Sequence, residues 1–161
     1  MMTMPQRCAP VRRLLERSQA PIALIEHWLT PCFDLAIRLY VASVFLRSGW
    51  LKLSDWSTTL ILFESEYQVP LLSPLFAALL GTGGELILPL LLILGLAGRF
   101  SAAALSVVNV VAAISFPELS DLGRQDHLLW GVLLLVTLLH GAGKLSIDTW
   151  LRGTANSPPL S

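Results

Sequence analysis

Apolar residues fall into four long runs along the chain, and shorter polar stretches separate these runs. A helix needs about 20 mostly apolar residues to cross the ~30 Å hydrocarbon layer of a bilayer, and each run is close to that length. The pattern therefore predicts an all-α fold, an integral membrane four-helix bundle. The predicted spans are residues 33–53, 73–96, 99–116 and 127–143.

The segments outside the spans complete the predicted domain organisation. Residues 1–32 are expected to form a cytoplasmic or interfacial N-terminal segment, and residues 33–151 form the transmembrane domain. Residues 152–161 are rich in Ser, Pro and small residues, which predicts a disordered tail. The first apolar run begins only after Pro31, farther from the start than the apolar core of a cleavable signal peptide. We therefore expect the first span to stay in the protein.

Composition agrees with a membrane location. The chain is 54% hydrophobic and 14% charged, with a mean hydropathy of +0.67. A soluble domain of this length would need more polar residues to cover its surface, so the surplus apolar area indicates a lipid bilayer as partner. The formal net charge is zero and no stretch is dense in Lys and Arg, so we expect no nucleic-acid partner.

The distribution of Lys and Arg predicts an orientation, because cationic residues that flank membrane spans are retained on the cytoplasmic side. Seven such residues lie on one predicted side and two on the other, which places both termini in the cytoplasm. The seven are Arg7, Arg12, Arg13, Arg17, Arg99, Lys144 and Arg152, and the two are Lys52 and Arg124.

A few polar residues fall inside the spans, where an ionisable side chain is costly and usually faces the bundle interior. At 100° per residue, Arg38 and Lys52 share one face of the first span with Gly49, whereas Arg47 points the opposite way. Counted from the outer ends of their spans, Arg38 and Glu85 lie at similar depth, so we expect them to pair. The predicted intramembrane polar centre is Arg38, Glu85 and Asn109.

This pair has two interpretations, a buried ion pair that fixes helix register or a functional centre. Small residues in the second span, Ala78 and Gly81, lie on nearly the same face as Glu85. Together with Gly49 they predict close packing between the first two spans, since small side chains let helices approach.

A second group of polar and aromatic residues is expected at the outer mouth of the bundle. His127, Asp126, Glu64 and Glu66 are acceptable ligands for a divalent metal, although the sequence favours the simpler interpretation that they are interfacial charges solvated by water. A quinone or another apolar carrier could lie beside Tyr67 and Trp130, although aromatic residues at a membrane interface are ordinarily anchors. The outer-mouth candidates are Lys52, Glu64, Glu66, Tyr67, Asp126, His127 and Trp130.

No motif in the sequence indicates a particular reaction. The chain contains no phosphate-binding loop, no haem or flavin motif and no CxxCH sequence. His127 and His140 lie toward opposite ends of one predicted span, so they cannot ligate one haem or one metal ion. Catalytic residues are therefore not assigned.

Several short motifs together resemble the DoxX family of small bacterial membrane proteins, over roughly residues 33–151. The segments around Glu64 and His127 look more specifically like its HvfX branch, although Ser65 stands where that branch commonly has an aromatic residue. The matching motifs are Arg38, residues 49–52 (GWLK), Glu85 with Leu86, residues 94–96 (LGL) with Arg99, and residues 141–148 (GAGKLSID); the branch motifs are residues 62–72 and 126–131.

This resemblance implies a multi-pass protein of the bacterial inner membrane and leaves three hypotheses for its role. The first is an auxiliary subunit of a redox-related or metal-stress-related system, such as the maturation of copper-associated peptides implied by the HvfX likeness. The second is an oxidoreductase subunit linked to a quinone. The third is a small transporter or export partner, which would need a homo-oligomer because four spans are few for a monomeric carrier. Protein partners are expected under all three.

Overall fold

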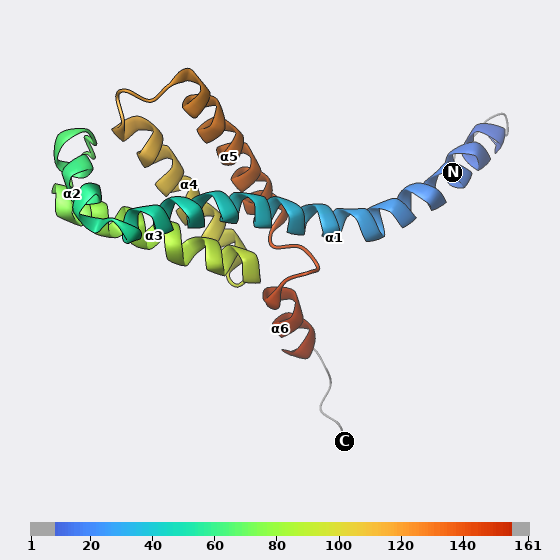
Figure 1. The fold of residues 1–161 in the computed structure, drawn as a ribbon. Helices are drawn as coiled ribbons and strands as arrows, with labels where there is room; N and C mark the ends of the chain where they lie inside the picture. Colours follow the sequence, from blue (N-terminus) through green and yellow to red (C-terminus); the bar gives the residue numbers. More distant parts are fainter. Residues whose placement is uncertain (1–8, 156–161) are drawn as a thin grey trace.

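The structure, a computed structural model, describes the backbone of residues 9–155 and the side chains of residues 27–151. Within these residues every regular element is a helix (Figure 1). The helices are α1 (Ala9–Ser54), α2 (Trp56–Ser65), α3 (Pro74–Leu94), α4 (Gly98–Ser115), α5 (Asp121–His140) and α6 (Ile147–Ala155).

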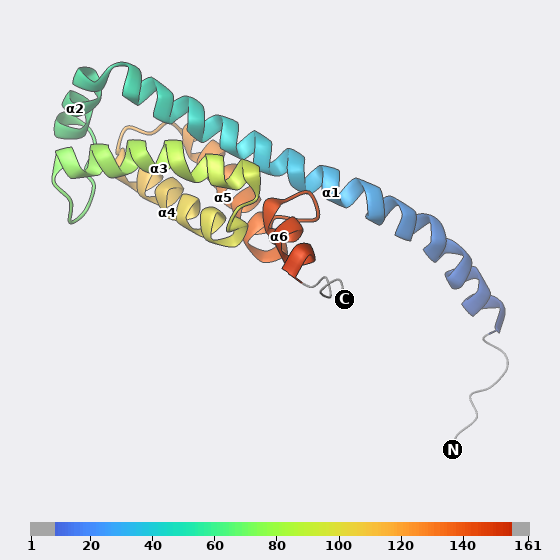
Figure 2. The same cartoon turned by 90° about the horizontal axis from the view of Figure 1, so that it is seen from below.

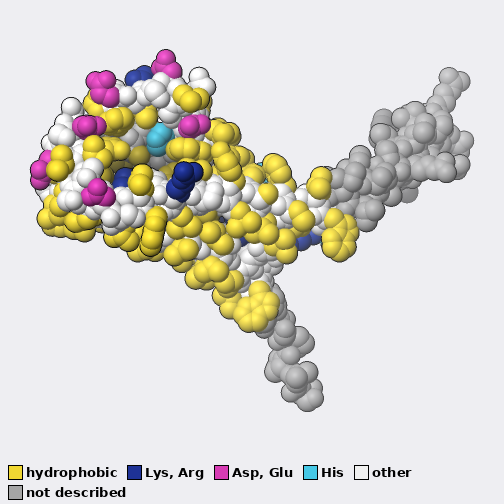
Figure 3. Space-filling view, viewed as in Figure 1, with side chains coloured by type: hydrophobic (Ala, Val, Ile, Leu, Met, Phe, Trp, Pro, Cys, Tyr) yellow, Lys and Arg dark blue, Asp and Glu magenta, His cyan; other side chains and the backbone are white. Residues whose placement is uncertain are grey.

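Among the described residues, four helices are long and apolar enough to cross a membrane, which confirms the predicted number of spans. They are His27–Ser54 within α1, then α3, α4 and α5. Hydrophobic side chains cover much of the side of the bundle that Figure 3 presents, whereas acidic side chains gather at the end where α2 lies. A bundle with this surface lies in a lipid bilayer, because lipid is the environment that such side chains prefer.

Several predicted segment boundaries differ from the structure, including those of the fourth span, which was predicted as residues 127–143 and is formed by α5 (Asp121–His140). Helix α1 begins at Ala9 and runs without a break past residue 32, so it projects beyond the bundle (Figure 2). Helix α6 continues to Ala155, past the predicted start of the tail at residue 152. Residues 1–8 and 156–161 lie outside the described residues.

Helices α1 and α3 pack together closely, and the stagger between them matters for the site. A Cβ atom on Gly49 would stand 3.0 Å from both Glu85 Cβ and Leu86 Cγ, so this glycine lets the end of α1 rest on the middle of α3. Gly49 therefore lies at a close contact between α1 and α3. The start of α3 extends beyond the end of α1, and Figure 2 shows α2 folded beside it.

The small residues in the first half of α3 pack against α2. Phe63 of α2 forms a buried cluster with Ala77 and Ala78, and Gly81 faces the ring of Phe63 at 3.6 Å from its Cβ position. Ala78 and Gly81 were predicted to pack against the first span, whereas the contacts found for them in the structure are with Phe63 of α2. Asp55 begins α2 by accepting a hydrogen bond from the backbone N–H of Thr58.

The opposite end of the bundle is closed by hydrogen bonds between distant segments. The α3–α4 turn has Gly95 at φ 64° and Ala97 at φ 48°. Asp148 accepts bonds from the backbone N–H groups of Ala97 and Gly98, each 2.9 Å long, and so caps α4. Arg38 donates to the carbonyl oxygens of Leu92, Ile93 and Leu145. We call this group of residues, Arg38, Gly95, Ala97, Gly98, Leu145 and Asp148, the clamp.

Candidate functional site

A buried ion pair between α1 and α3 is the centre of the candidate site. Lys52 Nζ donates to both carboxylate oxygens of Glu85, at 2.6 Å each, and to Ser48 Oγ at 3.2 Å. The Glu85 side chain is 5% exposed and that of Lys52 is 19% exposed. Each charge of such a pair depends on the other, because removing one partner leaves the remaining charge buried and poorly solvated.

The predicted pairing of Arg38 with Glu85 was wrong. Arg38 is buried in the clamp, where its guanidinium binds backbone carbonyl groups. The prediction assumed that the first two spans begin level with each other at the outer surface. In the structure the end of α1 meets the middle of α3, so Lys52 reaches Glu85 and Arg38 meets the last turn of α3.

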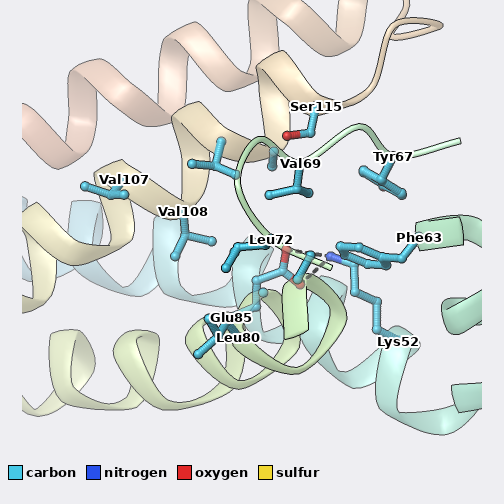
Figure 4. Close-up of a pocket in the computed structure, with 14 residues that line it drawn as sticks. Lys52, Phe63, Tyr67, Val69, Leu72, Leu80, Glu85, Val107, Val108 and Ser115 are labelled. Carbon is cyan, nitrogen blue, oxygen red and sulfur yellow. Dashed lines mark hydrogen bonds and ion pairs between the residues drawn. The ribbon is translucent and has the colours of Figure 1, made fainter. Parts of the chain in front are cut away.

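A cavity of about 180 Å³ opens beside the ion pair, between α2, α3, α4 and the loop that joins α2 to α3 (Figure 4). Lys52 and Glu85 form part of its wall, and most of the remaining wall is aliphatic. Leu80 and Val107, on α3 and α4, line the cavity and are more than half exposed on the outside of the bundle. The cavity therefore reaches the surface that faces lipid. Its other lining residues are Phe63, Tyr67, Val69, Leu72, Ala77, Gly81, Val108, Val111, Ala112 and Ser115.

Two further polar side chains line this cavity. Ser115 is buried, and within the described residues its hydroxyl has no hydrogen-bond partner. The Tyr67 ring stacks on Phe63 with centroids 4.6 Å apart and lies 5.3 Å from Phe116. Burial raises the pKa of the Tyr67 phenol, and the nearby Glu85 and Glu66 carboxylates raise it further. Tyr67 therefore stays protonated as a potential hydrogen-bond donor.

His127 and Asn109 form a second polar contact, between α5 and α4. Asn109 Nδ2 donates to the backbone oxygen of His127 at 2.8 Å, and its Oδ1 lies 2.8 Å from His127 Nδ1. The Trp130 ring packs edge-on against both His127 and Phe45. Asn109 thus binds α5 and lies apart from Arg38, so the three predicted members of the polar centre occupy three different places.

The predicted outer-mouth residues divide in the same way. Lys52 and Tyr67 line the cavity, whereas Trp130 packs against the hydrophobic core of the bundle and is not part of the cavity wall. Glu64 and Glu66 are exposed on α2 and at its end. No group of three or more His, Cys, Asp or Glu side chains could hold a metal ion among the described residues. His127, Asp126, Glu64 and Glu66 therefore do not combine into a metal site.

Most of the cavity wall was not predicted. Val69, Leu72, Val108 and Ala112 are ordinary residues of an apolar run or loop, and no sequence signal separates them from residues that face lipid. Ser115 carried a weak signal, since a hydroxyl at the end of an apolar span needs a partner.

The comparisons with known proteins identify the family. The sequence profile of the family DoxX matches residues 33–118, more than half of the chain. The chain belongs to the DoxX family. It is also 35% identical over 127 residues to an uncharacterized protein of Haemophilus influenzae, an alignment that covers 73% of this chain and 82% of that relative. No solved structure matches the chain.

The part of this DoxX-family protein that matches the profile contains the cavity. Lys52, Glu85, Tyr67 and Ser115 all lie within residues 33–118, whereas His127 lies beyond them. The comparisons establish the DoxX family and do not distinguish its HvfX branch.

Proposed function

We propose that this DoxX-family protein is a membrane subunit of a redox system and that its cavity binds the head group of a quinone. The observation that carries the proposal is the Lys52–Glu85 pair, which places a hydrogen-bond donor and an acceptor in the wall of an otherwise apolar cavity. A quinone ring needs apolar walls for its faces and hydrogen-bond donors for its carbonyl oxygens. Tyr67 and the Ser115 hydroxyl, which has no partner within the described residues, are the available donors, and Lys52 could join them by giving up one of its bonds to Glu85 or Ser48.

The size and position of the cavity support a ligand that comes from lipid. Its volume of about 180 Å³ is below the roughly 300–1,000 Å³ of pockets that enclose whole drug-sized ligands. Such a cavity suits a single ring, while an isoprenoid tail remains in the membrane. The partly exposed positions of Leu80 and Val107 favour entry between α3 and α4.

In this role the chain holds the ring and a partner protein supplies the electrons. Conversion of a quinone to a quinol consumes two electrons and two protons, so the proposed subunit works beside a redox partner. The copper-linked role implied by the HvfX likeness is less well supported, because Lys, Tyr and Ser are not the thiolate or imidazole ligands that copper favours.

A pair of neighbouring alanines offers a matched test. Ala112 lines the cavity, whereas its neighbour Ala113 lines a separate groove on the outside of α4 and α5. Leucine at residue 112 would fill part of the cavity without touching the ion pair. We expect the variant Ala112→Leu to carry at least about tenfold less quinone after purification from membranes. The leucine adds three methyl-sized groups to the space of the ring, which should weaken the binding free energy of the quinone by more than about 1.4 kcal/mol, the equivalent of a tenfold change in affinity.

The measurement is the quinone content of purified protein, by solvent extraction and mass spectrometry, followed by rebinding of a short-tailed ubiquinone. The control variant Ala113→Leu adds the same side chain and should retain the quinone. Equal quinone in both variants, or none in the unchanged protein before and after rebinding, contradicts the proposal.

We also propose that the clamp end of the bundle faces the cytoplasm of a bacterial inner membrane. Arg99 and Lys144 lie at that end, from which the N-terminal part of α1 with Arg12, Arg13 and Arg17 also projects, and cationic residues that flank membrane spans are retained inside. Single cysteines at Ser57 and Thr149, in a chain without Cys8 and Cys32, test this orientation. An impermeant maleimide should label only residue 57 in intact cells, and labelling of residue 149 alone would reverse the assignment.

A further inference from the structure

A polar hollow at the clamp end has features of an anion-binding site, and it is separate from the cavity at Lys52. Its volume is about 430 Å³. It lies between the start of α4, the end of α5 and the loop that leads to α6. Three basic side chains from these three segments line it, namely Arg99, His140 and Lys144.

The positive charges in this hollow are not neutralised by the carboxylate that shares it. Both oxygens of Asp148 accept bonds from the N–H groups of Ala97 and Gly98. Arg99 donates only to the backbone oxygen of Leu139, at 3.3 Å, and Lys144 donates to His27 Nδ1 at 3.2 Å. Within the described residues, neither Arg99 nor Lys144 forms an ion pair.

The loop that carries Lys144 is fixed in place. Gly141 and Gly143 have φ values of 86° and 71°, which a residue with a side chain rarely adopts. A Cβ atom on Gly143 would stand 2.9 Å from Asp34 Oδ2 of α1, so only glycine fits against that helix. His140 Nδ1 lies 3.0 Å from the backbone oxygen of Val136 and donates to it, so Nε2 of the neutral ring is an acceptor and the hydrogen-bond donors of the hollow are Arg99 and Lys144.

The surroundings of the hollow indicate where its ligand comes from. It opens at the ends of α4 and α5, where the spans reach the membrane surface. Phe100 lines the hollow and is 65% exposed, and Leu139 beside it is 66% exposed. A ligand here would contact basic groups and lipid-facing apolar groups together, which is the environment of a phospholipid head group.

We propose that this hollow binds the phosphate of an anionic phospholipid through Arg99 and Lys144. The shared chemistry is a phosphate oxygen anion that accepts hydrogen bonds from a guanidinium and an ammonium group. Phe100 and Leu139 would contact the upper part of the acyl chains.

The test compares binding of phosphatidylglycerol and phosphatidylcholine to the purified protein by native mass spectrometry. Arg99→Gln with Lys144→Gln should weaken phosphatidylglycerol binding by roughly 30-fold, because a basic group near a membrane surface contributes about fivefold to binding an anionic lipid. The control double variant, Arg47→Gln with Arg124→Gln, removes the same charge from two exposed residues outside the hollow and should bind as the unchanged protein does.

A single variant and a competitor complete the design. Lys144→Gln, which loses only a contact with His27, should weaken binding about fivefold and keeps the test valid if the double variant does not assemble. Inorganic phosphate at millimolar concentration should not displace the lipid. Equal loss in the control variant, unchanged binding in both hollow variants, or displacement by inorganic phosphate would each overturn the proposal.

Discussion

The two ends of the bundle use polar residues differently. At the clamp end, Arg38 and Asp148 form hydrogen bonds with backbone groups. These bonds join α1, α3, α4 and the segment that leads into α6. At the α2 end, Lys52 and Glu85 bind each other in the wall of a cavity, beside a Ser115 hydroxyl without a partner in the described residues. The clamp side chains bind mainly backbone groups of the protein itself, although Arg38 Nε has no partner in the described residues, whereas at the α2 end the polar side chains line the wall of a cavity.

This difference separates two kinds of motif residue. Arg38, Gly95 and Asp148 belong to motifs that carry the resemblance to the family, and the structure gives each a role in closing the fold. Lys52 and Glu85 belong to the same set of motifs, but their side chains bind each other and not backbone groups. A motif residue in a membrane bundle can thus serve the fold or the ligand, and its hydrogen-bond partners distinguish the two roles.

The largest effect is expected from filling the clamp at Gly95. The variant Gly95→Val would need a β-branched residue at φ 64°, and its Cβ atom would collide with Ser146 and with Arg38 Nη1. A strained backbone and an overpacked contact together should cost about 3–5 kcal/mol of unfolding free energy. Unfolding in a series of SDS and mild-detergent mixtures measures this loss.

Gly83 supplies the control for this prediction. It lies within α3, and a Cβ atom there would meet nothing within 4 Å. Gly83→Ala should therefore leave stability unchanged or raise it by up to about 1 kcal/mol, because alanine favours the helix. If Gly95→Val is as stable as Gly83→Ala, the clamp does not hold the bundle together.

A smaller effect is expected from breaking the ion pair. Lys52→Gln leaves the buried Glu85 carboxylate without its cation, which should cost about 2–3 kcal/mol at neutral pH. Glu85→Gln should cost less, about 1 kcal/mol, because Lys52 is partly exposed and its ammonium can turn toward water. The same SDS titration applies.

The double variant Lys52→Gln with Glu85→Gln distinguishes a ligand site from a structural pair. Two neutral amides can hydrogen-bond each other, so its stability should recover to within about 1 kcal/mol of the unchanged protein. Quinone content should nevertheless stay low, because the ammonium donor is gone. A stable double variant that retains its quinone would show that this pair only fixes the register of α1 and α3.

The sequence was sufficient to predict the membrane-spanning helices, but it was insufficient to predict how they are offset along one another. Apolar run lengths predict spans because the bilayer sets the length of a helix, and Gly49 was identifiable as a packing residue from its face of the helix. Run lengths do not specify how far one helix slides along another. That missing offset is why Arg38 was paired with Glu85 and why Ala78 and Gly81 were assigned to α1, when they receive Phe63 of α2.

The smallest expected effect is a pH dependence of α2, at the cavity end. The Thr58 backbone N–H lowers the pKa of Asp55, and the hydroxyls of Thr58 and Ser57 lower it further. A carboxylate with a lowered pKa in the folded state stabilises that state above its ordinary pKa of 3.8. This contribution decreases as the pH falls through that value and the lower folded pKa.

Acidification from pH 6 to about pH 3 should therefore speed amide hydrogen exchange in α2, after correction for the intrinsic rate, while α4 with its Asp148 cap serves as the internal reference. Asp55→Asn retains a side-chain oxygen that can cap the helix but does not titrate. In that variant, acidification should speed amide hydrogen exchange in α2 no more than it does in α4. If α2 loosens equally in both proteins, Asp55 is not the group that titrates, and the cavity end responds to acid through another carboxylate.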